Sequence, residues 1–112
     1  LVTLDELEAY RRPGPAGQAG HNWALDMAAR VNGREVSRGS LGDMDWTFAE
    51  ILERCAYGAD IFPTDIIGSG TVGTGCFLEL NGTGRRLHGD AFQPQWLREG
   101  DVVELEITGL GT

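Results

Sequence analysis

The chain contains no lysine: its nine basic residues are all arginines, in a sequence of 112 residues. Lysine acts as a general base or forms a Schiff base only because its amine can lose a proton, whereas the arginine guanidinium stays charged. The composition therefore excludes lysine-based catalysis from this segment.

Positive charge as a whole is also scarce, since 17 acidic residues give a net charge of −8. Phosphates and anionic membrane surfaces attract clustered basic residues, so we expect neither nucleic acid nor a membrane as a partner. The sequence has no signal-peptide pattern and no apolar run of about 18 residues. We expect a soluble, cytoplasmic protein.

The cysteines, Cys55 and Cys76, lie far apart and form no C-x-x-C pair. This spacing indicates neither a metal site nor redox chemistry. In a cytoplasmic protein we expect both to be buried free thiols.

Glycine, by contrast, is abundant: its 17 residues are roughly twice the average share of about 7%. So many glycines favour tight turns and a sheet-rich fold. The clearest local signal is Asn32-Gly33, which predicts a hairpin turn between an alternating strand at residues 23–29 and a return strand at 35–37. The length fits one domain.

Apolar spacing predicts one main helix at about residues 46–57, opened by Asp45 or Thr47 and ended by Gly58. Thr3 and Glu6 form a capping box for a shorter helical segment at residues 4–10. The remaining predictions are an exposed loop at 11–20, a buried strand at 65–67, a strand at 76–80 with a turn at 81–84, and a strand at 102–107 after a turn at 98–101. The pattern predicts a sheet-dominated α+β fold of short strands.

Residues 68–75 form a glycine-rich loop that could hold an anion. Its glycines let backbone N–H groups approach closely, and Thr71 adds a hydroxyl donor. The loop precedes a predicted strand rather than a helix and has no lysine, so it is neither a dinucleotide-binding fingerprint nor a P-loop. A binding loop and an ordinary flexible turn remain alternative interpretations.

Glu79 is the second candidate. On a strand it shares a face with Phe77, where a desolvated carboxylate would suit acid–base catalysis; the alternative is a half-exposed face. Glu104 and Glu106 also share a strand face, but the opposite face is apolar, so a solvated outer face explains the pair without a metal. The other candidates are isolated turn, cap or surface residues: Asp43, Asp45, His21, His88 and Asp90.

Several short motifs follow one another along the chain. They are V-N-G with Glu35 at residues 31–35, F-A-E-I-L at 48–52, T-D-I-I-G-S-G-T at 64–71, G-D-V-V-E-L-E-I at 100–107 and G-L-G-T at 109–112. In these motifs and their order, the chain resembles the C-terminal part of the fumarylacetoacetate hydrolase family over most of residues 22–112. The resemblance implies a mixed β-roll fold and a homodimeric enzyme that acts on small oxo-acids.

The resemblance also implies roles for individual residues. Gly70 and Thr71 match the loop that holds the substrate's carboxylate or oxo group, and Glu79 matches a catalytic glutamate that helps a histidine to activate water. Hydrolysis of carbon–carbon bonds in 1,3-diketo acids is the first reaction implied. Decarboxylation, hydration or isomerisation in the same family is an alternative, and so is a non-catalytic segment for assembly or ligand binding.

The family's cofactor is Mg²⁺ or Ca²⁺, held by carboxylates that lie upstream with a lysine and a histidine. No residue of this chain matches that set. We therefore expect residues 1–112 to be the C-terminal segment of a longer catalytic domain, without metal ligands and inactive in isolation.

Overall fold

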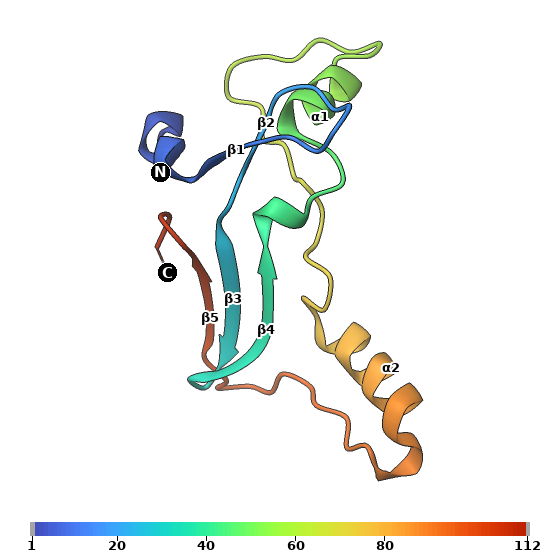
Figure 1. Ribbon diagram of the computed structural model, residues 1–112. Helices are drawn as coiled ribbons and strands as arrows, with labels where there is room; N and C mark the ends of the chain where they lie inside the picture. The colour runs from blue at the N-terminus through green and yellow to red at the C-terminus, as the bar shows by residue number, and fades with distance from the viewer. Residues whose placement is uncertain (1, 112) are drawn as a thin grey trace. The chain divides into compact units, whose positions relative to one another are not determined.

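The computed structural model describes residues 2 to 111. They divide into two compact units, one made of residues up to 25 with 40–70 and the other of residues 26–39 with 71–111. Figure 1 shows the elements along the chain. The structure is mixed α+β, with short antiparallel strands and helices, which confirms the predicted class at this level.

The first unit contains the predicted main helix, α1 (Phe48–Cys55). Thr47 is its N-cap, and Thr47 and Glu50 form a capping box in which each backbone N–H donates to the other's side chain. The capping box of Thr3 and Glu6 is confirmed too, although it opens a 3-10 helix, η1 (Leu4–Tyr10).

Two predictions in this unit were wrong. Part of the expected loop forms β1 (Arg11–Pro13), which pairs antiparallel with β2 (His21–Trp23). The expected strand at residues 65–67 is irregular chain, and Ile66 is 97% exposed. An apolar run predicts a strand only where a neighbouring strand can pair with it. The unit's remaining short helix is η2 (Leu41–Asp43).

The second unit is built on a three-stranded sheet in the order β4-β3-β5, with β3 (Asp26–Val31) in the centre (Figure 1). The hairpin to β4 (Arg34–Ser40) is confirmed: Asn32 and Gly33 both have positive φ, 51° and 75°. The strand β5 (Val103–Ile107) pairs antiparallel with β3.

The main correction concerns residues 76–84. The structure forms helix α2 (Phe77–His88) where we predicted a strand and a turn, and η3 (Gly89–Ala91) follows it. Two glycines inside α2 disfavour a helix by about 1 kcal/mol each relative to alanine. Tertiary contacts offset this cost. Asn81 exchanges two hydrogen bonds with the backbone of Gln95, at 2.7 and 2.9 Å, and Gly84 lies directly against the Phe92 ring.

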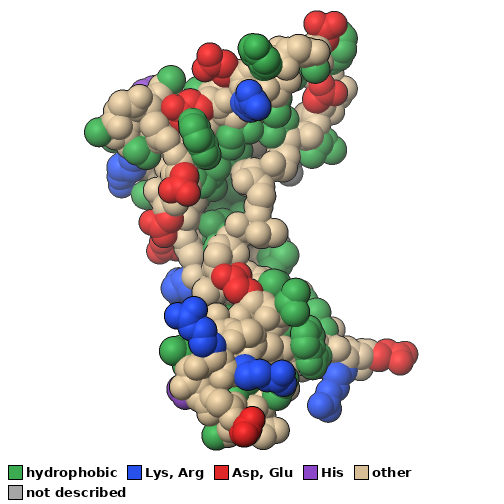
Figure 2. Space-filling view, turned by 90° about the vertical axis from the view of Figure 1, so that its right-hand side faces the viewer, with side chains coloured by type: hydrophobic (Ala, Val, Ile, Leu, Met, Phe, Trp, Pro, Cys, Tyr) green, Lys and Arg blue, Asp and Glu red, His purple; other side chains and the backbone are tan. Residues whose placement is uncertain are grey.

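The buried apolar core is small. Among the described residues, Leu25 and Ala28 are the buried hydrophobic side chains. Both cysteines are free, but the prediction that they are buried was wrong, since Cys55 and Cys76 are exposed. Hydrophobic side chains lie at the surface among charged ones in the face that Figure 2 shows. No helix of residues 2–111 is long and apolar enough to cross a membrane.

Candidate functional site

The predicted site residues of the second unit, Thr71 and Glu79, lie on either side of the start of α2. Thr71 lies in the glycine-rich loop that leads into the helix, and Glu79 lies in the first turn of α2. The Thr74 N–H donates a hydrogen bond to Glu79 Oε2 at 2.8 Å. Glu79 therefore folds back from the helix onto the loop.

The loop itself is a tight turn. The Gly75 N–H donates to the Val72 carbonyl at 2.9 Å, and Thr74 adopts a positive φ of 64°. A non-glycine residue is held in this region only where its surroundings fix it. The carboxylate of Glu79 supplies one such contact. The Thr74 hydroxyl, 3.5 Å from Ser37 Oγ on β4, supplies another.

Thr71 and Glu79 line one pocket of about 300 Å³. The loop and α2 form one wall, and the sheet forms the other, including Met27, Ala29 and Leu105. A mostly apolar pocket with a few polar groups is typical of a small-molecule site. Both residues are exposed, which agrees with the alternative of an exposed Glu79 and not with a desolvated carboxylate.

Gly70 is not part of this wall. It belongs to the other compact unit, at the point where the chain passes from one unit to the next. Its φ is 91°, a conformation that L side chains rarely adopt, and a Cβ at this position would meet nothing within 4 Å. Glycine is thus required here by backbone conformation rather than by crowding.

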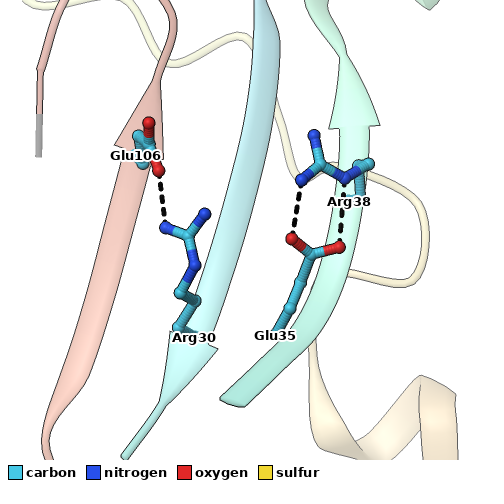
Figure 3. A network of polar contacts seen from close by, with 4 residues as sticks. All are labelled: Arg30, Glu35, Arg38 and Glu106. Carbon is cyan, nitrogen blue, oxygen red and sulfur yellow. Dashed lines mark hydrogen bonds and ion pairs between the residues drawn. The ribbon is translucent and has the colours of Figure 1, made fainter. Parts of the chain in front are cut away.

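The charged face of the sheet holds ion pairs that sequence reasoning missed (Figure 3). Arg30 on β3 donates to Glu106 on β5 at 2.5 Å, and Arg38 donates to both carboxylate oxygens of Glu35 at 2.7 and 3.0 Å. These hydrogen bonds raise the pKa of both arginines and lower the pKa of Glu35. The pairing of β3 with β5 joins residues 76 positions apart, so no local pattern could have indicated the contact.

The ion pair between Arg30 and Glu106 also makes Glu106 less available as a metal ligand. Hard divalent cations need several converging oxygen ligands, whereas Glu106 is engaged by Arg30. In the part of the chain that the structure describes, no three His, Cys, Asp or Glu side chains are placed to hold a metal ion. The residues present therefore do not fit Mg²⁺ or Ca²⁺.

The chain belongs to the fumarylacetoacetate hydrolase family: the model of its C-terminal domain, "Fumarylacetoacetate (FAA) hydrolase C-terminal", matches residues 2–112. This confirms the resemblance drawn from the motifs. The family is one of enzymes.

Curated relatives are distant and longer. The chain is 31% identical to oxaloacetate tautomerase YisK of Bacillus subtilis over 79% of its own length and 25% of that protein. It is 28% identical to two uncharacterized proteins of Staphylococcus epidermidis over its whole length and 29% of theirs. The chain thus spans less than a third of the length of these relatives. No solved structure matches it.

Proposed function

We propose that this chain supplies a substrate-binding loop and an acid–base carboxylate to an enzyme that acts on small oxo-acids. The supporting observation is that Thr71 and Glu79 line the same pocket. The Thr71 hydroxyl donates to the substrate's carboxylate or oxo oxygen, and Gly70 gives the chain just before Thr71 the positive φ that it has there. The Glu79 carboxylate accepts a proton from water or from the carbon between two carbonyl groups.

Hydrolysis of a carbon–carbon bond in a 1,3-diketo acid is the first candidate reaction, and the family model supports it. Keto–enol isomerisation of an oxo-acid is the second, since a relative is named an oxaloacetate tautomerase. The two reactions differ in their products. A hydrolase splits a 1,3-diketo acid into two acids, whereas a tautomerase changes the enol absorbance of oxaloacetate without consuming it.

The coverage of the relatives supports a further part of the proposal, that residues 1–112 are the C-terminal segment of a longer catalytic domain. A β-roll fold and a homodimeric assembly are also part of the proposal, on the family resemblance alone. The Mg²⁺ or Ca²⁺ of such an enzyme would be held by other residues, because no three carboxylate, His or Cys side chains of residues 2–111 converge.

Substituting Glu79→Gln in the complete natural protein tests the catalytic role. Glutamine has an oxygen that can still accept the Thr74 N–H bond, so the loop keeps its contact while the basic carboxylate is lost. We expect kcat to fall by about 10²–10⁴ with KM changed little.

The matched control is Glu99→Gln, the same change at an exposed turn residue. A folded Glu79→Gln enzyme with most of its activity would remove Glu79 from the mechanism.

A further inference from the structure

The loop that carries Thr71 packs against β4 at Gly39. A Cβ atom at Gly39 would lie 2.4 Å from Val72 Cγ1, closer than two carbon atoms that are not bonded to each other can approach. Gly39 has no positive φ, unlike Gly33 or Gly70. Its backbone could therefore take any residue, and glycine is needed only for the space that the Val72 side chain fills.

The backbone of Val72 is linked to the rest of the site by a chain of contacts. The Val72 carbonyl accepts the Gly75 N–H, and a Cβ at Gly75 would lie 2.6 Å from that same oxygen. Thr74, between them, is held by Glu79 and faces Ser37. A displacement of Val72 would consequently move its neighbour Thr71 and disturb the Thr74–Glu79 hydrogen bond together.

We propose that Gly39 is a positioning residue: by admitting the Val72 side chain, it fixes where Thr71 and the Thr74–Glu79 pair stand in the pocket, and so sets the affinity for the oxo-acid. Gly39, Thr71, Val72 and Glu79 all line that pocket. The assignment to the oxo-acid rests on the proposed function. The packing of Val72 against Gly39, which places the loop on β4, does not depend on that function.

A double-mutant cycle in the complete natural protein tests whether the packing of Val72 against Gly39 positions the loop. It uses Gly39→Ala, Val72→Ala and the two substitutions together. Gly39→Ala places a methyl group 2.4 Å from Val72 Cγ1, and Val72→Ala removes that carbon. One readout is the NMR amide signals and hydrogen exchange of residues 71–75. The other is the Kd for oxaloacetate, with circular dichroism as a check of folding.

We expect Gly39→Ala to shift the loop signals and to weaken oxaloacetate binding by about 10- to 100-fold, as small misplacements in a site do. Adding Val72→Ala should restore both readouts to those of Val72→Ala alone. Gly82→Ala is the matched control, because it adds the same methyl group on α2 with nothing within 4 Å. It should leave both readouts unchanged.

The outcomes distinguish the positioning role of Gly39 from the proposed function. Wild-type loop signals in Gly39→Ala would contradict the positioning role, and so would a double variant whose loop signals and Kd are no closer to those of Val72→Ala than Gly39→Ala itself. Loop signals that shift in Gly39→Ala and are restored in the double variant support the positioning role. If the wild type then fails to bind oxaloacetate or a 1,3-diketo acid, only the proposed function is wrong. Should Gly39→Ala fail to fold, folding of the double variant is itself the rescue.

Discussion

At the scale of single residues, Glu79 and Thr71 differ in what their contacts allow. Glu79 already uses one carboxylate oxygen to hold the loop through Thr74. A hydrogen bond to a charged acceptor is stronger than a neutral one, so Glu79 has a positioning role beside any catalytic one. Substitution by glutamine separates the two roles, whereas substitution by alanine would remove both.

Thr71→Val in the complete protein should act on binding. The change keeps the shape of the side chain and removes the hydroxyl that we propose donates to the substrate, which should weaken binding by about 1–3 kcal/mol if the substrate oxygen is left unsatisfied. We expect KM to rise at least as much as kcat falls, in steady-state kinetics. Thr83→Val makes the same change at an exposed position of α2 and serves as the control. An unchanged KM in a folded Thr71→Val enzyme would contradict the assigned role.

The candidate site could be predicted from the sequence only in part. Thr71 and Glu79 were found because they lie in short motifs, and their roles stay predictions. The residues that hold the loop in place, Ser37 and Gly39, are more than 30 positions away in the sequence, as the Ser37–Thr74 contact shows. Their contribution depends on where β4 lies, which no local pattern states.

At the scale of elements, local sequence patterns predicted the hairpin correctly but failed for α2. Asn32-Gly33 predicted its turn correctly because a turn of this type is determined by the φ values of its own residues. Asn81-Gly82 looked equally like a turn, but Asn81 is satisfied by Gln95 and Gly84 is packed against Phe92. Tertiary contacts overrode local propensity in the second case.

The hairpin turn between β3 and β4 also forms hydrogen bonds with the residues that immediately precede β5. Asn32 donates from Nδ2 to Asp101 Oδ1 at 2.9 Å, and its Oδ1 accepts the Val102 N–H at 2.9 Å. The hydrogen bond from Asn32, with a second from the Arg98 N–H, lowers the pKa of the Asp101 carboxyl below its usual 3.8. The charged carboxylate is thus favoured in the folded chain.

This shift predicts a pH dependence. Because the folded pKa of Asp101 is lower than the unfolded one, its contribution to stability is complete above about pH 4 and is lost as the pH falls through the folded pKa. Asp101→Asn should therefore reduce the loss of thermal stability between about pH 5 and pH 2, measured by circular dichroism. Asp60→Asn, at an exposed position of the other unit, is the control. Equal acid sensitivity in Asp101→Asn and wild type would count against the contact.

At the scale of the whole molecule, the sequence indicated the family but not the assembly. The family motifs are short and keep their order along the chain, so they indicate the family even where a named relative is only 31% identical. Which surfaces become buried depends on partners or segments that the motifs do not describe. Leu105 illustrates this point: alternation predicted an apolar face on β5, yet that side chain is 66% exposed.

The exposed apolar surface predicts that the 112-residue chain, by itself, self-associates or is only marginally folded. The second unit exposes Leu78, Leu87, Trp96, Leu97, Val103 and Leu105, and β4 and β5 are both edges of its sheet. Exposed edges and large apolar patches promote association.

Sedimentation velocity should show oligomers that increase with concentration, or denaturant titration should give a broad transition at low concentration. Leu105→Asn should reduce the association by making the apolar sheet face polar. Leu4→Asn, at a similarly exposed leucine of η1 in the other unit, should reduce it less. A clean monomer with a sharp two-state transition would contradict this prediction. It would show that the few buried side chains are enough to stabilise the fold and that the exposed sheet face does not mediate association.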